Sequence, residues 1–275
     1  AVHNEMVMPY ILSFGTEEQK LHWLPKMVRG EVIGALGLTE PHVGSDLRNI
    51  RTSAVRDGDE YVISGQKTFI SNGQLCDVVV LATKTDPNAK EGGISLFIVE
   101  SSRTGFVKGR RLEKIGLKAQ DTSELFFEEM RVPVSNLLGP EHGGFKLLMK
   151  NLAQERLTQA VRSAVVVETV IDYTIAYATE RKMFGQTLAD FQNTQFKLAD
   201  METELQAARV MLYEAAGRLD RDDPAGFDQG IDGLHGVRRW ARIGADRRGP
   251  GGHRGPVKAG WCHARVRPPT PQRVR

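Results

Sequence analysis

The sequence predicts an α+β protein in which helical segments flank a central antiparallel β domain. Apolar residues recur at helical spacing in residues 1–33, alternate with polar residues from 34 to 140, and return to helical spacing from 141 to 219. The remaining residues, 220–275, are rich in Gly, Arg and Pro and have no apolar period, so we expect a disordered tail. These observations define four segments of the 275-residue chain.

Residues 1–33 are expected to form two short helices. Tyr10 and Ile11 belong to the first apolar stripe, and Gly15-Thr16 is typical of a helix end followed by a new N-cap. Two short helices cannot enclose a core, and the first residue is not Met. We therefore expect this segment to be the remainder of a longer N-terminal helical domain that is truncated here.

The β domain is predicted from alternating sequence in residues 34–140. Asp57-Gly58 supplies the positive φ angles that a tight hairpin turn needs, between strands expected at residues 52–55 and 61–64. Further strands are expected at residues 78–83, 94–99 and 124–130.

Two long helices are predicted after the β domain. Residues 145–179 contain neither Pro nor Gly, which favours one continuous helix, and Gly185 interrupts the pattern. Apolar residues from Leu188 to Leu219 then recur at intervals of three and four, as in a helix packed against a neighbour. Such a pair is expected to be part of an incomplete helical bundle.

The charge distribution separates the tail from the rest. Residues 1–220 hold 12 Lys, 13 Arg and 29 acidic residues, a net charge of −4, whereas residues 221–275 hold 1 Lys, 11 Arg and 5 acidic residues, a net charge of +7. Because the Arg to Lys ratio changes so abruptly, we expect the tail to be read from a shifted frame of a GC-rich gene. Its Arg-Gly stretch lacks interleaved aromatic residues, which disfavours nucleic-acid binding.

Several protein classes are disfavoured by composition. No run of 18 apolar residues occurs, and the N-terminus has no basic stretch leading into an apolar one, so a membrane span and a secretion signal are not predicted. A cytoplasmic protein is the expectation. Cys76 and Cys262 are isolated and the seven His residues lack ligand spacing, so no metal site is expected.

Two turn segments, Leu38–Asp46 and Lys67–Gly73, carry hydroxyls beside exposed backbone amides. In the first segment, Gly44 lies between the hydroxyl residues Thr39 and Ser45. In the second, Ser71 adds a hydroxyl close to Phe69, whose ring could cover a flat cofactor. An extended anionic cofactor such as a flavin nucleotide needs these features. The other interpretation is that both segments are ordinary turns of a β domain.

Glu155 lies within the first long helical pattern, in the segment Gln154-Glu155-Arg156-Leu157. Its helical neighbours Leu148, Asn151 and Leu152 place the carboxylate beside an apolar face. Desolvation is expected to raise its pKa, which suits a general base. The other interpretation is a surface glutamate with good helix propensity.

Taken in order, the motifs resemble the acyl-CoA dehydrogenase family over residues 1–219. The motifs that carry the resemblance are Leu38-Thr39-Glu40-Pro41 with Gly44-Ser45-Asp46, Phe69–Gly73, Gly116–Thr122, Gln154–Leu157 and Glu180–Gly185. The resemblance implies an N-terminal helical domain, a central β domain and a C-terminal helical bundle, in agreement with the periodicity.

The resemblance also implies FAD as cofactor and a set of binding residues. The residues expected to line FAD within one chain are Leu36, Leu38, Thr39, Gly44, Ser45, Phe69, Ile70 and Ser71. Arg181 and Gln192 are expected to reach the FAD of a neighbouring subunit, which implies a homo-oligomer, a tetramer by resemblance. The residues expected to contact the acyl-CoA substrate are Ser45, Lys146, Ala153, Gln154 and Arg156.

The reaction implied by the resemblance is the α,β-dehydrogenation of a fatty acyl-CoA in β-oxidation. Glu155 would remove the α proton while the β hydrogen leaves as hydride to FAD, and an electron-transferring flavoprotein would take the electrons. The thioester carbonyl would be polarised by the backbone amide of the base residue and a flavin hydroxyl. A glutamate at this helix position is typical of long-chain and isovaleryl members, so we expect a long-chain enzyme. The alternatives are a branched-chain enzyme, or an inactive remnant that binds acyl-CoA or FAD.

Overall fold

The computed structural model describes residues 2–89 and 93–221, all of which belong to one unit by their contacts. The predictions of disorder and of a shifted frame concern the tail, which lies outside the described residues apart from Asp220 and Arg221.

The N-terminal segment is helical, as predicted. A π-helical turn, η1 (Val2–Val7), precedes α1 (Met8–Phe14) and α2 (Glu17–Val28). Thr16 caps α2: its hydroxyl accepts a hydrogen bond from the N–H of Gln19, whose side chain accepts one from the N–H of Thr16. The other end of the Gln19 amide donates to the carbonyls of Ser135 and Leu137, which ties α2 to the β domain.

The β domain contains one twisted sheet in the order β6-β7-β3-β2-β4-β5-β8, with β1 paired to β4. The predicted strands are present and mostly longer than expected: β2 (Ser53–Asp57), β3 (Glu60–Ser71), β4 (Val78–Lys84), β5 (Ile94–Glu100) and β7 (Thr122–Pro133). The sequence did not predict β1 (Gly34–Gly37), β6 (Phe106–Arg111) or β8 (Leu137–Leu138). Most neighbours are antiparallel, but β4 pairs in parallel with β1 and, at one position, with β2.

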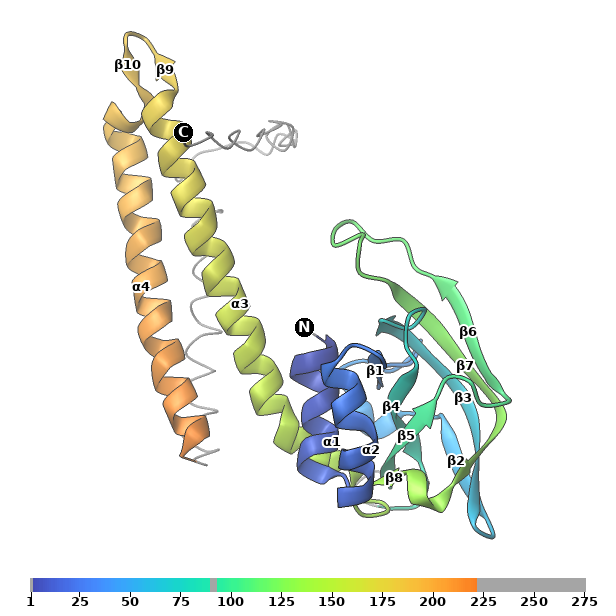
Figure 1. Cartoon of the computed structure of the whole chain (residues 1–275). Helices are drawn as coiled ribbons and strands as arrows, with labels where there is room; N and C mark the ends of the chain where they lie inside the picture. Colours follow the sequence, from blue (N-terminus) through green and yellow to red (C-terminus); the bar gives the residue numbers. More distant parts are fainter. Residues whose placement is uncertain (1, 90–92, 222–275) are drawn as a thin grey trace, which may run out of the picture. The chain divides into compact units, whose positions relative to one another are not determined.

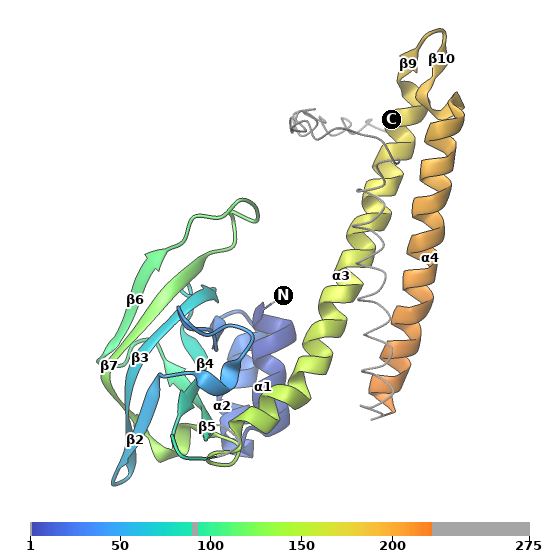
Figure 2. The ribbon, with the colours of Figure 1, turned by 180° about the vertical axis from the view of Figure 1, so that it is seen from behind.

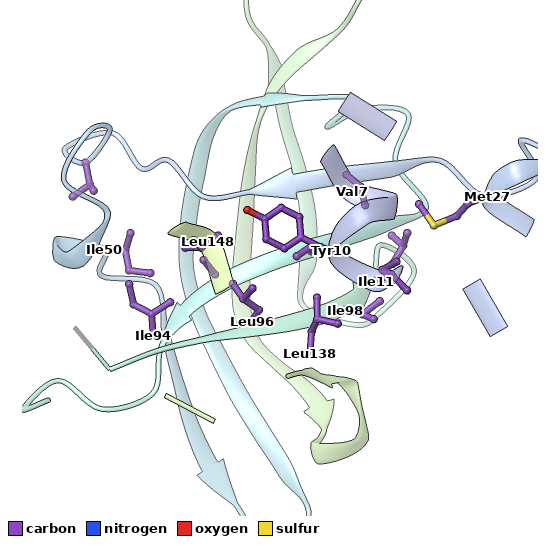
Figure 3. Close-up of a cluster of buried hydrophobic side chains, with 14 residues drawn as sticks. Val7, Tyr10, Ile11, Met27, Ile50, Ile94, Leu96, Ile98, Leu138 and Leu148 are labelled. Carbon is purple, nitrogen blue, oxygen red and sulfur yellow. The ribbon is translucent and has the colours of Figure 1, made fainter. Parts of the chain in front are cut away.

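Each face of the sheet is covered by its own hydrophobic core, because alternate residues of β4 and β5 point to opposite sides. Val80 and Leu96 join the first core with Tyr10 and Ile11 of α1, whereas Val79 and Phe97 join the second with Leu125 of β7. Figures 1 and 2 show α1 and α2 against one side of the sheet, and Figure 3 shows side chains of that first core.

The two predicted long helices are α3 (Gly144–Glu180) and α4 (Gln192–Asp220), which lie side by side in antiparallel directions (Figures 1 and 2). A small hairpin, β9 (Lys182–Met183) and β10 (Gln186–Thr187), joins them through Gly185, whose φ of +82° favours glycine. Residues 188–190 form the 3₁₀ turn η4, so α4 begins later than the apolar spacing indicated.

Only a narrow strip of the helix pair is buried. Leu212 and Ala215 of α4 pack against Ala153 and Leu157 of α3, and Arg209 forms an ion pair of 2.7 Å with Glu168. Apolar side chains remain exposed on the rest of both helices, including Val165, Val170 and Tyr173 of α3 and Phe196, Val210 and Tyr213 of α4. In the part of the chain that the structure describes, no helix is both long and apolar enough to cross a membrane.

Candidate active site

The turn after β1 closes on itself at its beginning. The N–H of Glu40 donates to the carbonyl of Val43 at 2.9 Å, and the N–H of Val43 donates back at 3.0 Å. Gly44 and Ser45 follow this closed loop and are exposed. A Cβ atom built on Gly44 would meet no protein atom within 4 Å, so the surface beside the turn is open.

A buried ion pair lies beneath this turn. Lys67 of β3 donates to a carboxylate oxygen of Glu40 at 2.9 Å and to the carbonyl of Leu38 at 3.0 Å. The Glu40 carboxylate also accepts hydrogen bonds from the N–H groups of Arg51 (2.7 Å) and Thr52 (2.9 Å). These four bonds fix both ends of the turn to the sheet.

The two charges of this pair respond differently to burial. Burial alone would raise the pKa of Glu40, but Lys67 and the two backbone amides together hold it below its usual value. Burial lowers the pKa of Lys67 to about 8, although Glu40 opposes the shift. The geometry, with three donors around the carboxylate, supports the ionised pair as the form present near neutral pH.

An irregularity in β3 joins the second predicted segment to this turn. The pairing of β3 with β7 shifts register between Lys67 and Ile70, so Thr68 does not pair with β7. Instead, the N–H of Thr68 donates to the carbonyl of Thr39 at 2.9 Å, and the hydroxyl of Thr39 donates to the carbonyl of Thr68. The two motifs therefore meet through their threonines.

The irregularity also determines where Phe69, Ile70 and Ser71 point. Phe69 has a φ of +59°, which is unfavourable for a non-glycine residue, and its ring is 68% exposed. Ile70 is buried in the second core, so only its backbone can contact a ligand, while Ser71 is half-buried. Leu36 and Leu38 are also half-buried and pack against the first core.

Glu155 is half-buried in the N-terminal third of α3, and one of its oxygens, Oε1, has two partners. Tyr10 of α1 donates its hydroxyl to this oxygen at 3.0 Å, and the side-chain amide of Asn151 donates to it at 3.4 Å. Burial raises the pKa of Glu155, while the two hydrogen bonds oppose the rise. The predicted direction of this shift is confirmed.

The backbone amide of Glu155 is not placed as the family resemblance implied. Glu155 lies well inside α3, where each N–H donates to the carbonyl four residues earlier. The amide is therefore directed at the carbonyl of Asn151 rather than at a bound thioester. The expectation that this amide polarises the substrate carbonyl is wrong for the helix described here, and another donor is needed.

The predicted substrate residues on α3 point in different directions. Gln154 and Arg156 flank Glu155 and are exposed, whereas Ala153 is half-buried in the cluster that α3 forms with α4. Lys146 is exposed in the first turns of α3, next to Phe145, whose ring lies 4.7 Å from the guanidinium carbon of Arg48. Their roles stay predictions.

Arg181 and Gln192 lie at the other end of the helix pair. Arg181 caps the C-terminus of α3 and Gln192 begins α4, and both side chains are exposed. Arg181 follows Glu155 by about 39 Å along the helix, at about 1.5 Å per residue. Within one chain these two residues do not join Glu155 and the turn in a single cluster.

An open hollow of about 1020 Å³ is lined by residues that follow Ser71 and Glu155 in the chain, although neither Ser71 nor Glu155 lines it. Asn72 and Leu75, just after Ser71, line one side, and Leu157 and Val161 of α3 line another. Small-molecule pockets typically measure roughly 300–1,000 Å³, so this hollow has room for a flat ring with an attached chain.

Sequence reasoning missed two functional features of this site. The buried pair of Glu40 and Lys67 was not predicted, although both residues lie within the two turn segments. Tyr10 was assigned to an apolar stripe only. A tyrosine on a buried face needs a partner for its hydroxyl, and this rule was the available signal for the contact with Glu155.

Comparison with known proteins relates most of the chain to one family. Residues 1–31 match the N-terminal domain of acyl-CoA dehydrogenases, residues 35–130 match the middle domain, and residues 142–232 match the C-terminal domain.

Individual relatives support the same conclusion. The chain is 48% identical to the mitochondrial long-chain specific acyl-CoA dehydrogenase of Sus scrofa over 77% of this chain and 50% of the relative. It is 39% identical to the mitochondrial isovaleryl-CoA dehydrogenase of Pongo abelii over 79% of this chain and 52% of the relative. It therefore spans about half the length of these curated relatives.

A solved structure gives the same relationship in three dimensions. The crystal structure of an acyl-CoA dehydrogenase from Geobacillus kaustophilus superimposes with a TM-score of 0.82 and 45% identity, over 89% of this chain and 66% of that one. The three consecutive domain matches and these similarities show that the chain belongs to the acyl-CoA dehydrogenase family, whose members are FAD-dependent flavoproteins.

Proposed function

We propose that this chain carries the flavin-binding and proton-abstracting parts of a long-chain acyl-CoA dehydrogenase, with Glu155 as the general base. The observation that carries the proposal is the environment of Glu155: a half-buried carboxylate on α3 whose pKa is raised by burial. A carboxylate removed from bulk water is a stronger base for an α proton than one on the surface.

The residues of the two turns fit FAD. Thr39 and Ser71 each carry a hydroxyl and backbone polar groups that a flavin ring could contact. The open surface at Gly44 and Ser45 leaves room for a pyrophosphate. Phe69 is held in an unfavourable backbone conformation with its ring exposed, and such outliers concentrate at functional sites. Bound FAD would accept the β hydrogen as hydride.

The chain's own residues would orient the acyl-CoA and move its α proton. Glu155 would take the proton on a carboxylate oxygen, and the apolar side of the hollow, including Leu157 and Val161, would offer a surface for the acyl chain. Ser45, Lys146, Ala153, Gln154 and Arg156 are proposed to contact the substrate. The donor that polarises the thioester is proposed to come from outside this part of α3, where the backbone N–H groups are used within the helix.

Long-chain substrates are favoured over branched ones by the greater identity to the long-chain relative, 48% against 39% for the isovaleryl relative. A branched-chain enzyme is the second candidate, because the isovaleryl relative matches over a similar share of the chain. The shape of the acyl pocket decides which acyl chain length is accepted. One methylene group changes the relative transition-state binding free energy of two substrates by only about 1–3 kcal/mol.

We further propose a homo-oligomer, a tetramer as in the family, in which Arg181 and Gln192 contact the FAD of a neighbouring chain. The exposed apolar residues on α3 and α4 support this proposal, since such surface is normally covered in an assembly.

An electron-transferring flavoprotein is the proposed acceptor of the electrons. A cytoplasmic location stays a prediction.

The test uses the chain reconstituted with FAD and mixed anaerobically with acyl-CoA thioesters of increasing length and with isovaleryl-CoA. We expect the visible flavin absorbance to bleach fastest with long straight chains. Glu155→Gln is expected to retain bound flavin and lose bleaching. Bound flavin that no thioester bleaches in the unmodified chain would favour an inactive remnant, and bleaching retained in Glu155→Gln would contradict the role of Glu155.

A further inference from the structure

We propose that Tyr10 is the positioning residue of the base: its hydroxyl holds one carboxylate oxygen of Glu155, Oε1, and leaves the other, Oε2, to take the proton. This inference rests on the proposed role of Glu155 and adds a second residue, from a distant part of the chain, to that site. Tyr10 belongs to α1 and precedes Glu155 by 145 residues.

Tyr10 is held rigidly enough to define the direction of the carboxylate. Only 1% of its surface is exposed, and it packs within the first core together with Val7, Ile11 and Leu148. In Figure 3 the phenol oxygen of Tyr10 lies on the side where Leu148 of α3 is drawn. Its ring centroid is 6.0 Å from that of Phe14. A side chain packed on all sides cannot follow the carboxylate, so the carboxylate must adapt to the hydroxyl.

The hydrogen bonds distinguish the two oxygens of Glu155. Both bonds that the described residues make to the carboxylate, from Tyr10 at 3.0 Å and from Asn151 at 3.4 Å, fall on Oε1. Oε2 therefore keeps its lone pairs for an incoming proton. In the proposed step the α C–H bond would break and its proton would move to Oε2, and FAD, when bound, would supply the acceptor for the β hydrogen as hydride. Tyr10 keeps its own proton throughout.

Tyr10 also affects how readily Glu155 ionises. Burial of the carboxylate favours its protonated form, and a donated hydrogen bond favours the ionised form, so Tyr10 limits the rise in the pKa of Glu155. Burial and the neighbouring carboxylate raise the pKa of Tyr10 itself far above its ordinary value, which keeps the phenol a neutral donor at working pH.

Lys150 and Arg156 are the charged residues beside Glu155 on α3 itself, and both are exposed. Helix α4, whose Leu212 and Ala215 pack against α3, brings Glu214 and Arg218, which pair at 2.8 Å. On α1, Tyr10 is the only titratable residue. The turn η1 brings His3, whose ring bonds to the carbonyl of Met27 and the N–H of Gly34, and the exposed Glu5. Strand β5 ends with Glu100, which pairs with Arg103. The pH response of Glu155 is therefore expected to follow its contacts with Tyr10 and Asn151.

The first experiment measures the pKa of Glu155 directly in the full chain without cofactor, by carboxyl carbon NMR, with Glu155→Gln used to assign the signal. Tyr10→Phe is expected to raise this pKa by roughly one unit, because a hydrogen bond to a charged group is lost. The matched control is Tyr61→Phe, which removes another fully buried tyrosine hydroxyl bonded to a glutamate, Glu141, in the second core. An unchanged pKa in Tyr10→Phe, or equal shifts in both variants, would overturn the proposal.

A second variant covers the case in which Tyr10→Phe fails to fold. Site-specific 3-fluorotyrosine at position 10 keeps the hydroxyl but makes it a stronger donor, so the pKa of Glu155 is expected to fall. A pKa that stays or rises would refute the role.

In the FAD-loaded chain, the acidic limb of the pH profile of the bleaching rate is expected to move to higher pH in Tyr10→Phe and to lower pH with 3-fluorotyrosine. If Glu155→Gln still bleaches, the proposed function fails, whereas the NMR titration tests Tyr10 independently of that result.

Discussion

The carboxylate of Glu40 and the ammonium group of Lys67 lie 2.9 Å apart, with side-chain exposures of only 1% and 0%. Glu40 belongs to the first turn segment proposed to bind FAD, and Lys67 belongs to β3, whose end forms the second proposed segment. Lys67 also bonds to the carbonyl of Leu38. One buried ion pair thus fixes the relative positions of the two segments.

Breaking this pair from the lysine side is expected to be costly. Lys67→Met keeps the volume of the side chain but leaves the Glu40 carboxylate buried with two backbone donors and the His42 Nε2 atom 3.5 Å away. We expect a loss of about 3–5 kcal/mol in the free energy of unfolding, measured by urea denaturation. The double variant Glu40→Gln with Lys67→Met is expected to recover part of this loss, because no unpaired charge remains.

The control for this prediction is Lys20→Met, which breaks the surface pair that Lys20 forms with Glu17 at 2.8 Å. Such a pair contributes at most about 1 kcal/mol. Equal costs for Lys67→Met and Lys20→Met would show that the buried pair has no special role.

Gly65 of β3 is expected to tolerate no side chain. Its φ is +147°, and a Cβ atom there would lie 2.6 Å from the Cα of Thr52, the residue whose N–H binds Glu40. Gly65→Ala is therefore expected to lower the free energy of unfolding by about 2 kcal/mol or more. Gly116→Ala, where a Cβ would meet nothing within 4 Å, is the matched control and is expected to be near neutral. The steric argument fails if both variants have the same unfolding midpoint.

Most regular elements followed from local patterns, and the exceptions have physical reasons. The long helix ending at Glu180 was predicted to within about one residue because its apolar run contains no Pro or Gly. Strand β1 was missed because two of its four residues are Gly and its partner β4 lies far along the chain. Strand β6 was missed because its residues are mostly polar and exposed.

The stability of the chain is expected to depend on pH through Glu155. Burial raises the folded-state pKa of Glu155 above the unfolded value of about 4.3. Below the unfolded-state pKa, Glu155 is protonated in both the folded and the unfolded chain, and its burial then costs the folded state no desolvation of a charge. The folded state loses this relative stability as the pH rises from the unfolded-state pKa through the folded-state pKa. Glu155→Gln is therefore expected to be more stable than the unmodified chain at pH 7, as measured by urea denaturation.

The same comparison at a pH near 4 supplies the internal check, since the advantage of Glu155→Gln is expected to shrink there. Glu180→Gln, at an exposed position at the end of the same helix, serves as the external control and is expected to show no such pH dependence. A stability difference for Glu155→Gln that does not vary with pH would contradict the desolvation of this carboxylate.

The exposed valines of α3 are expected to lie in a subunit contact. Val167 and Val170 are 44% and 55% exposed in the single chain. Burying a glutamate at either position costs several kcal/mol, so Val167→Glu or Val170→Glu is expected to reduce the assembly to smaller species in sedimentation velocity. Val55→Glu on β2, where the valine is 64% exposed, is the matched control. An unaltered sedimentation profile for both α3 variants would exclude this face from the contact.

The candidate site was only partly predictable. Glu155 could be found because Leu152 and Leu148, three and seven residues before it, form an apolar face on the same helix. The contact with Tyr10 could not, because it joins residues 145 positions apart and depends on how α1 packs against α3. The bonds between Thr39 and Thr68 depend likewise on a register shift of β3 against β7, which no local pattern encodes.

The last prediction concerns a flavin site shared between two chains. Ser45→Asp is expected to repel the cofactor's pyrophosphate from the open turn, and Arg181→Ala is expected to remove a cation at the end of α3, where the side chain is exposed. Each variant alone should therefore lose FAD, as measured by the visible absorbance that remains after desalting. If the turn of one chain and the arginine of another form each site, mixed assemblies contain some sites in which both are intact. Unfolding and refolding the two variants together is expected to restore about a quarter of the bound flavin in a two-chain assembly, because half of the assemblies are mixed and each mixed assembly has one intact site of two. Refolding each variant alone is the control, and a mixture that binds no more flavin than the separate variants would place Arg181 outside the cofactor site, because complementation requires both residues at one cofactor.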